Sequence, residues 1–437
     1  MASLESVLRE CLPKDEQFEL LNLQNIPMET KPLVTSLSSN NDSDRNSKTI
    51  KVPHFFALAH NKKFVYGIEI HVYLILSSTN GAGTYDKVER LLFVSKADTN
   101  GYCDVKFSAK QVTKGLIHYL MTLDPVTYLR HVIPLERKYT LHDKKTLLTR
   151  STSLTDALEI LSQRTKLTHK PESSALQSDR YFLSFSPTGP VTTKLCIFTR
   201  PADQYLFADS AKNPRKHTLS GAGLLKWWVS IVDEVICEDF TPDSDARLRI
   251  PGEDDLTVRR FLRGTKFAKW TPGDIFGGEA NSLAVFSIPL FSDDPKSRFL
   301  HELVEENMIM KTNLNQFWIE LQERQEFKLS ETVSVIGISG LNSKAPSGIP
   351  LPKEVVRTDS KKYFKYVKNY ITGEEYDTSE GAEESYRNTV QYLSLKYNSE
   401  LLQISGKRAS HSGVKENAPV VRAVTMLQPR KKVKTTK

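Results

Sequence analysis

The sequence of 437 residues predicts an α/β fold formed by a single large domain. Hydrophobic residues make up 39% of the chain and aromatic residues 9%, which is enough for a sizeable core. Segments with the two-residue period of strands are interspersed with segments that have the 3.6-residue period of helices. They follow one another irregularly, without an internal repeat or a regular βαβ order. One domain is therefore the simplest organisation, and we place it at residues 1–406.

Two strands and a helix are predicted in the first third of the chain. Residues 64–76 (FVYGIEIHVYLIL) are rich in β-branched and aromatic side chains, and Glu69 and His71 alternate with apolar neighbours. Residues 90–97 (RLLFVSKA) are predicted to form the partner strand. A capping-box pattern begins at Ser108, so a helix should start there. Its apolar stripe consists of Leu116, Tyr119, Leu120 and Leu123.

Further strands and helices are predicted in the second half of the chain. Apolar runs predict strands at 181–186, 193–199 and 283–291. Residues 224–236 (LLKWWVSIVDEVI) predict a helix with Trp228 on its apolar face. The remaining predicted helices are 299–308, 315–327 and a C-terminal one that carries Tyr386, Val390, Leu393, Tyr397 and Leu401 at helical spacing.

The net charge of +8 is concentrated at the C-terminal end. Residues 407–437 hold nine of the 60 Lys and Arg and one of the 52 Asp and Glu, which leaves 51 of each in residues 1–406. We interpret 407–437 as a disordered basic tail. Its last residues, PRKKVKTTK, are typical of a nuclear-localisation cluster or a contact for an acidic partner, and a merely solubilising end is the alternative. The neutral body argues against strong direct DNA binding, which needs a basic face.

Two other polar segments are predicted to lie on the surface. Residues 36–48 (SLSSNNDSDRNSK) contain few apolar side chains and predict a flexible loop. Residues 136–178 form a basic insertion, with eight basic and three acidic residues between Arg137 and Lys170. This insertion suits an acidic protein partner, and a mobile loop without a partner explains it equally well.

Cysteine and histidine spacing indicates neither disulfides nor a metal site. The cysteines are widely spaced, without a CxxC pair, which is typical of reduced and mostly buried thiols in an intracellular protein. The ten histidines show no HExxH or HxxxH spacing, so no metal is expected. No apolar stretch approaches 18 residues, and we therefore expect neither a transmembrane helix nor a membrane partner.

Two adjacent aspartates, Asp293 and Asp294, precede the helix predicted at 299–308. They are followed by Pro295, so Asp294 could simply be a helix N-cap with proline at the first helical position. Alternatively, the two carboxylates could attract a cationic substrate and raise each other's pKa. A raised pKa would make one of them a better base at neutral pH.

Several sequence motifs resemble one known family. They are LLFVSKADTNGYC (91–103), LCIFTRPADQYLF (195–207), LKWW (225–228), ARLRIPGED (246–254), IPLFSDDPKSRF (288–299), FWIELQERQEFKLS (317–330) and YITGEEYDT (370–378). Together they resemble the fungal histone acetyltransferases first described as regulators of Ty transposition. The resemblance extends from about residue 15 to 405. The Q/R-x-x-G-x-G/A phosphate loop of other acetyltransferases does not occur in this chain.

The resemblance implies a fold, an activity and partners. The fold would be a mixed central sheet flanked by helices, similar to acetyltransferases of the CREB-binding-protein type. The activity would be transfer of acetyl from acetyl-CoA to lysines of histone H3, including one near the point where DNA enters the nucleosome. The partners would be histone H3–H4, an acidic chaperone of the nucleosome-assembly-protein type docked on 136–178, and a chaperone of the anti-silencing type. The enzyme would be nuclear and would serve replication-coupled chromatin assembly, genome stability and transcription regulation.

The resemblance also implies which residues bind acetyl-CoA. The corresponding positions here are Ala97, Asp98, Thr99, Lys106, Phe107, Ser108, Ala109, Lys110, Phe198, Ala202, His217, Thr218, Leu219 and Trp227. Lys106 and Lys110 flank a helix start that could bind phosphate, although relatives carry arginine there and lysine lacks the bidentate fork. Ala222 and Gly223 stand where acidic residues are expected, which weakens the predicted helix start.

For catalysis, the resemblance favours Asp294 as the group that accepts and donates the proton. Asp293 and Asp98 would be supporting carboxylates, and Trp228 would lie beside the channel for the substrate lysine. Lys296 would form a salt bridge with the aspartates and would become acetylated by the enzyme itself. Whether a true general base operates is open at this point. A chromatin adaptor that has lost catalysis is the alternative function, and a nucleic-acid-binding protein has only the tail in its favour.

Overall fold

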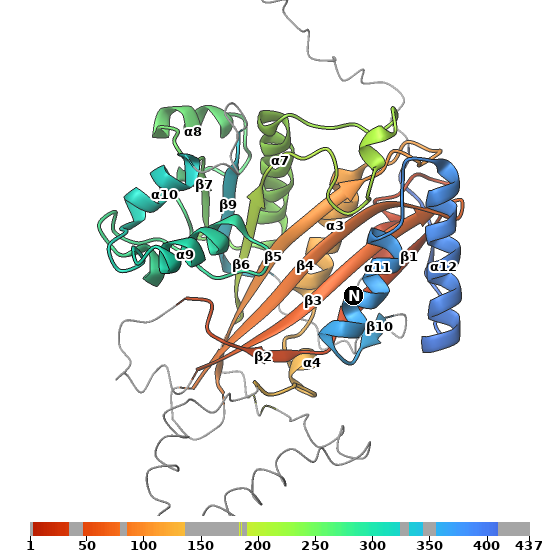
Figure 1. Cartoon of the computed structure of the whole chain (residues 1–437), viewed down its shortest axis with the longest axis horizontal. Coiled ribbons are helices and arrows are strands. Elements are labelled where there is room, and N and C mark those ends of the chain that lie inside the picture. The colour runs from red at the N-terminus through yellow and green to blue at the C-terminus, as the bar shows by residue number, and fades with distance from the viewer. Residues whose placement is uncertain are drawn as a thin grey trace, which may run out of the picture.

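A mixed sheet of 11 strands forms the centre of the computed structural model (Figure 1). The structure describes residues 3–34, 47–78, 85–135, 183, 185, 190–323, 332–343 and 355–409. The order across the sheet is β10 (Val355–Thr358), β1 (Gln17–Asn25), β3 (Ser47–His60), β4 (Lys63–Ser77), β5 (Lys87–Thr99), β6 (Thr192–Thr199), β9 (Ser334–Leu341), β7 (Asp245–Arg249) and β8 (Trp270–Pro272). Two short strands extend it, since β2 (Met28–Thr30) pairs with β3 and β11 (Leu402–Ser405) pairs with β1.

Long antiparallel pairings hold the middle of the sheet, and the parallel pair β5–β6 lies beside them. The β3–β4 and β4–β5 pairs are antiparallel, whereas β5 and β6 run parallel from Glu89↔Thr192 to Val94↔Ile197. The β4–β5 register shifts because Glu69 pairs with Lys96 and Ile70 pairs with Val94, which leaves one extra residue in β5. Such bulges redirect the strand that carries them and are common next to active sites.

One face of the sheet is covered by α1 (Leu4–Arg9), α3 (Ala109–Thr122) and α7 (Gly221–Asp239). The apolar stripes predicted for α3 and α7 pack on it: Leu116, Leu120, Ile231 and Val235 are all fully buried. The small elements are α4 (Val126–Leu129), α8 (Asp255–Phe261) and the 3-10 helices η2 (Ser210–Lys212) and η3 (Ala284–Phe286). Alternate strand residues point to this face and to the opposite face, as the pleat requires.

Two separate apolar clusters cover the opposite face. One is formed by α11 (Lys361–Thr372) and α12 (Ser379–Tyr397) over β1 and β3, and the other by α9 (Pro295–Glu305) and α10 (Leu314–Glu323) over β5 and β6. Figure 1 shows α9 and α11 on this side of the sheet, with β3 and β4 visible between them. Polar residues of β3 and β4 therefore lie between two apolar clusters.

Most predicted elements are confirmed, and a few predicted boundaries are wrong. The predicted strands 64–76, 90–97 and 193–199 are β4, β5 and β6. The strand predicted at 283–291 is wrong: residues 284–286 form η3, and the chain around it packs irregularly in the α9–α10 cluster. The helix predicted to begin at 299 begins at Pro295.

The predicted loop 36–48 and tail 407–437 are each too long at one end. Ser47 and Lys48 already belong to β3. Lys407 and Arg408 are fixed by backbone N–H groups that donate to the carbonyl oxygens of Arg9 and Leu12. The rest of these segments, the basic insertion 136–178 and most of the predicted strand 181–186 lie outside the described residues.

All four cysteines are described, and none forms a disulfide; Cys11 and Cys196 are buried, Cys103 is half-buried and Cys237 is exposed. Within the described ranges, no three or more His, Cys, Asp or Glu side chains are grouped to hold a metal ion. No helix of the described part is long and apolar enough to cross a membrane.

Candidate functional site

A cavity of about 510 Å³ opens where β5 and β6 separate. The two parallel strands pair only as far as Val94 and Ile197, and the segments that continue beyond these residues form two of its walls. Ligands commonly bind at the carboxyl ends of neighbouring parallel strands, and this volume is in the usual range for a ligand site. The remaining walls come from the segment 216–219, from α7 and from the loop before α9.

The cavity brings together most of the predicted site residues. Those that line it are Ala97, Asp98, Thr99, Ala109, Phe198, Ala202, His217, Thr218, Leu219, Trp227, Trp228, Asp293 and Asp294. Those outside the lining are Lys106, Phe107, Ser108, Lys110 and Lys296. Residues from four parts of the sequence, 97–109, 198–202, 217–228 and 293–294, thus converge at one site.

Asp98 organises one wall of the cavity. Its Oδ2 accepts the backbone N–H groups of Tyr205 at 2.7 Å and Leu206 at 3.0 Å, and its Oδ1 lies 2.9 Å from Nζ of Lys216. The side chain is 8% exposed. Because its oxygens are already occupied, Asp98 acts by positioning the loop at 205–207 and Lys216, not as a free carboxylate.

Lys216 lines the cavity but is absent from the residues that the sequence motifs indicate. Its side chain is 3% exposed and its Nζ also donates to Oγ of Ser210 at 2.8 Å. Gly101 has φ +83°, and a Cβ there would stand 2.7 Å from the backbone nitrogen of Lys216. Its partner Asp98 is 118 positions away in the chain, so no local sequence pattern predicts that Lys216 lies at the cavity.

The start of α7 forms the second wall. Ser220 is the N-cap and its Oγ accepts the N–H of Gly223, so the helix begins three residues before the predicted Leu224. A Cβ at position 221 would lie 2.4 Å from the carbonyl oxygen of Thr332, so the first helical position has no space for a side chain. The helix then presents the indole rings of Trp227 and Trp228, whose centroids are 4.8 Å apart at 81°.

Asp294 and Lys296 form a fully buried ion pair at the third wall. Asp294 is the N-cap of α9, and Pro295 follows at the first position, so the capping interpretation is correct. Nζ of Lys296 donates to Oδ1 of Asp294 at 3.0 Å and lies 2.9 Å from Oδ2. Apart from this contact with the ammonium, Oδ2 has no hydrogen-bond partner among the described residues. Asp294 is also one of the residues that line the cavity.

Burial and charge act in opposite directions on this pair. Burial raises the pKa of Asp294, and the Lys296 ammonium opposes that rise without cancelling it. Burial alone would lower the pKa of Lys296, but Asp294 more than compensates and the pKa of Lys296 is raised. The Lys296 ammonium also lies 4.9 Å from the ring centre of Phe198.

Asp293 behaves differently from its neighbour. It adopts a left-handed conformation with φ +60°, and its side chain is 47% exposed. Its carboxylate contacts Nζ of Lys96 at 2.5 Å and Nη1 of Arg298 at 3.6 Å. The pKa rise of Asp294 therefore comes chiefly from burial, and the predicted repulsion by Asp293 is not its main cause.

Of the predicted site residues at the start of α3, only Ala109 lines the cavity. Ser108 caps α3 by accepting the N–H of Gln111, as predicted, and Ala109 contributes to the lining. Lys110 pairs with Glu234 of α7 at 2.8 Å, while Lys106 is exposed. Lys110 is thus engaged in holding α3 against α7.

These features suit transfer chemistry on an amine. An apolar and aromatic wall can enclose an acyl chain, and Lys96, Lys216, Arg200 and Arg298 supply cations for phosphate groups. The buried Asp294 has a raised pKa, and the Lys296 ammonium is the only contact of its Oδ2 among the described residues, so this carboxylate can accept a proton.

Comparison with known proteins gives one consistent family. The family model described as "Histone acetyltransferase KAT11-type domain" matches residues 4–392. The chain is 35% identical over 291 residues to "Histone acetyltransferase RTT109" of Candida albicans, which covers 66% of this chain and 75% of the relative. It is 27% identical over 270 residues to "Histone acetyltransferase rtt109" of Schizosaccharomyces pombe, which covers 56% of this chain and 71% of that relative.

A solved structure has a similar fold. The "Crystal structure of Rtt109 from Aspergillus fumigatus" aligns with a TM-score of 0.62 over 94% of this chain and all of that chain, at 18% identity. The alignment supports the central mixed sheet with helices on both faces.

Proposed function

The chain belongs to the KAT11-type family of histone acetyltransferases, and on that premise we propose that its cavity between β5 and β6 holds the acetyl group of acetyl-CoA beside Asp294. The enzyme transfers acetyl from acetyl-CoA, its co-substrate, to histone lysines. The observation that carries the proposal is the buried Asp294, which combines a raised pKa with one carboxylate oxygen that accepts no hydrogen bond from the described residues.

The co-substrate would be held by residues from three walls. Ala97, Thr99 and the first turn of α3 would offer backbone groups, while Phe198 and Trp227 would enclose the pantetheine arm. The segment from His217 to Leu219 would cover the adenine end, and Ala202 would line its path. Lys216, rather than Lys110, is the cation best placed for a phosphate, because its ammonium is held at the cavity wall by Asp98.

Acetyl transfer requires a neutral amine. A free lysine with a pKa near 10.4 is neutral in roughly one molecule in 2,500 at pH 7. Oδ2 of Asp294 would accept a proton from the neutral amine as its nitrogen bonds to the thioester carbonyl carbon. As the carbon–sulfur bond breaks, Asp294 would donate this proton to the departing thiolate of CoA, which leaves acetyl-lysine and the free thiol. Trp228 would line the channel for the substrate lysine, and Asp293 would add negative charge at its mouth when its partners move aside.

Lys296 is proposed to be acetylated by the enzyme itself. Its ammonium is completely buried against Asp294 and the Phe198 ring, so acetylation would remove the positive charge that now faces the carboxylate. Lys296→Arg keeps the charge but cannot be acetylated. Unchanged acetyl-CoA affinity and turnover in this variant would reject the idea.

The finer biological assignment follows the same family. We propose histone H3 within H3–H4 as the substrate, including its lysine near the point where DNA enters the nucleosome, and a nuclear site of action. Acidic chaperones of the nucleosome-assembly-protein and anti-silencing types would activate the enzyme, the first through residues 136–178. The domain would span residues 1–408, with the rest of the basic tail as an accessory.

The test is acetylation of H3–H4 by the purified protein, with and without a nucleosome-assembly chaperone, followed by mass spectrometry. Asp294→Asn keeps an N-cap residue but removes the base, and we expect turnover to fall by about 10²–10⁴. Asp293→Asn is the matched control at the exposed neighbour and should lose much less. Thermal unfolding would establish that both variants fold. Equal activity in both would reject Asp294 as the proton acceptor, and no acetylation by the unaltered protein would reject the enzyme.

A further inference from the structure

A polar seam, defined as Lys51, Glu69 and His71, lies on the sheet between the α9–α10 and α11–α12 clusters. All three side chains are at least nine-tenths buried. Glu69 accepts from Nε2 of His71 at 3.2 Å, and Lys368 of α11 donates to it at 3.0 Å. Together the His71 and Lys368 contacts outweigh burial and lower the pKa of Glu69 to about 2. The only carboxylate of the seam is therefore fully ionised and already has two partners.

Positive charge is in excess around this seam. Burial and, to a smaller extent, the neighbouring lysines Lys361 and Lys368 lower the pKa of Lys51 to about 8 against the opposing charge of Glu69. Lys51 has no carboxylate within ion-pair distance among the described residues, and its Nζ donates instead to Oγ of Ser292 at 2.5 Å. A buried cation surrounded by like charges gains from the approach of an anion.

The outer face of α11 extends this charge to the surface. All four charged residues of α11 are lysines, and Lys361, Lys362 and Lys365 are exposed. Tyr363 and Tyr366 stand between them with 46% and 51% of their surface exposed. Tyrosine is enriched at protein interfaces because its ring packs while its hydroxyl donates a hydrogen bond.

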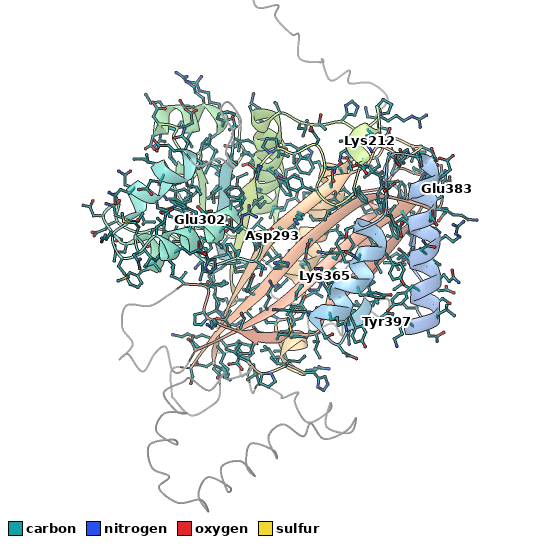
Figure 2. The ribbon with its side chains drawn as sticks, in the orientation of Figure 1. Lys212, Asp293, Glu302, Lys365, Glu383 and Tyr397 are labelled. Atoms are coloured by element: carbon teal, nitrogen blue, oxygen red, sulfur yellow. The ribbon has the colours of Figure 1, made fainter. Side chains whose placement is uncertain are left out.

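The face is continuous with the candidate active site. Lys368 reaches Glu69, Lys51 reaches Ser292, and Ser292 directly precedes Asp293 at the cavity. Figure 2 shows Lys365 on α11 and Asp293 on the same side of the sheet. A partner bound along α11 would thus lie next to the place where a lysine substrate enters.

We propose that the lysine–tyrosine face of α11, together with Lys51, binds an Asp/Glu-rich segment of a partner protein. Charge complementarity selects this occupant, because all charged residues of α11 are lysines and the chain outside its basic tail has no net charge to favour a nucleic acid. The inference rests on the proposed function in one respect. If the substrate is a basic histone, the protein that carries it is expected to be acidic. An acidic segment held on α11 would leave the carried histone beside Asp293.

Lysine footprinting of the full chain tests the site directly. The protein is labelled with an amine-reactive ester, with and without an oligoglutamate peptide, and the labelled lysines are quantified by mass spectrometry. We expect loss of labelling at Lys361, Lys362 and Lys365 when the peptide is present. Lys266 and Lys269, exposed near α8 on another part of the surface, are internal controls and should be unaffected. Footprinting separates this site from the basic tail, which can also attract the peptide.

Charge reversal supplies the second measurement. Lys361→Glu/Lys365→Glu should abolish the protection at Lys362 and reduce stimulation by an acidic chaperone about tenfold, while acetylation without chaperone stays unchanged. The matched control is Arg263→Glu/Lys266→Glu at the end of α8, which should change neither. Unprotected α11 lysines, or stronger protection by single-stranded DNA than by oligoglutamate, would overturn the proposal. Protection without any histone acetylation would instead reject the proposed function and leave this binding site standing.

Discussion

Replacing Lys296 by methionine should destabilise the protein in a pH-dependent manner. The change removes the only cation that contacts Asp294 among the described residues and leaves a carboxylate with 0% side-chain exposure. Removal of one partner from a buried pair typically costs about 3–5 kcal/mol. Protonation of Asp294 limits this cost, because neutralising a carboxyl group of ordinary pKa 3.9 at pH 7 requires about 4 kcal/mol. We therefore expect a loss of about 3–4 kcal/mol at pH 7.

The sign of the pH dependence follows from the same residue. Without Lys296, the pKa of Asp294 in the folded state rises further above its unfolded value, so the folded state binds the proton more tightly. The destabilisation should then shrink by about 1.4 kcal/mol for each pH unit below 7, and should be small near pH 5.

Urea unfolding of the wild type and the variant at pH 5 and pH 7 measures the two losses. Asp294→Asn/Lys296→Met, a neutral pair of similar shape, is the control and should recover most of the stability at pH 7. A loss that is the same at both pH values would refute the reasoning, as would a double variant no better than Lys296→Met.

Three further predictions concern groups around the cavity and the seam. Asp98→Asn should weaken acetyl-CoA binding about tenfold by calorimetry, because Lys216 loses its carboxylate and the 205–207 loop loses charged acceptors; unchanged affinity would contradict this role. Gly221→Ala should destabilise the protein by about 1–3 kcal/mol, because its Cβ would meet Thr332, whereas Gly223→Ala should be neutral or stabilising. The ion pairs of Glu69 add about 3 kcal/mol that is present above pH 4.5 and lost as pH falls toward 2, so Glu69→Gln should flatten this acid limb in urea unfolding.

Local sequence patterns were sufficient to predict an element where the residues of that element alone indicate its type. The β-branched and aromatic residues around Glu69 and His71 predicted β4, although both faces of this strand are buried. The stripe through Leu116 and Leu120 predicted α3, because its periodicity reports one buried face. The run 283–291 has strand-like composition, but its apolar side chains pack around η3 in the α9–α10 cluster. Composition alone cannot distinguish an irregular buried segment from a strand.

The cavity depends on contacts between distant segments, which limits what the sequence predicts. The doublet at 293–294 and the tryptophans of α7 carry recognisable motifs, and the fold brings them together. Lys216 has no such motif, since its place is fixed by Asp98 and by the close approach of Gly101. Conversely, Lys110 fits a phosphate-binding pattern, but Glu234 of a helix that follows 124 residues later engages it.

The two adjacent aspartates have different backbone conformations and different environments. The left-handed conformation of Asp293 directs its carboxylate outward to Lys96 and Arg298, and the chain then turns Asp294 inward to cap α9. Repulsion between neighbouring carboxylates is thereby avoided, since each has its own cations. The exposed member keeps a screened ion pair at the cavity mouth, and the buried member keeps a raised pKa beside the Lys296 ammonium. A cap and a proton acceptor are therefore compatible roles for Asp294, because the cap uses Oδ1, while Oδ2 contacts only the Lys296 ammonium among the described residues.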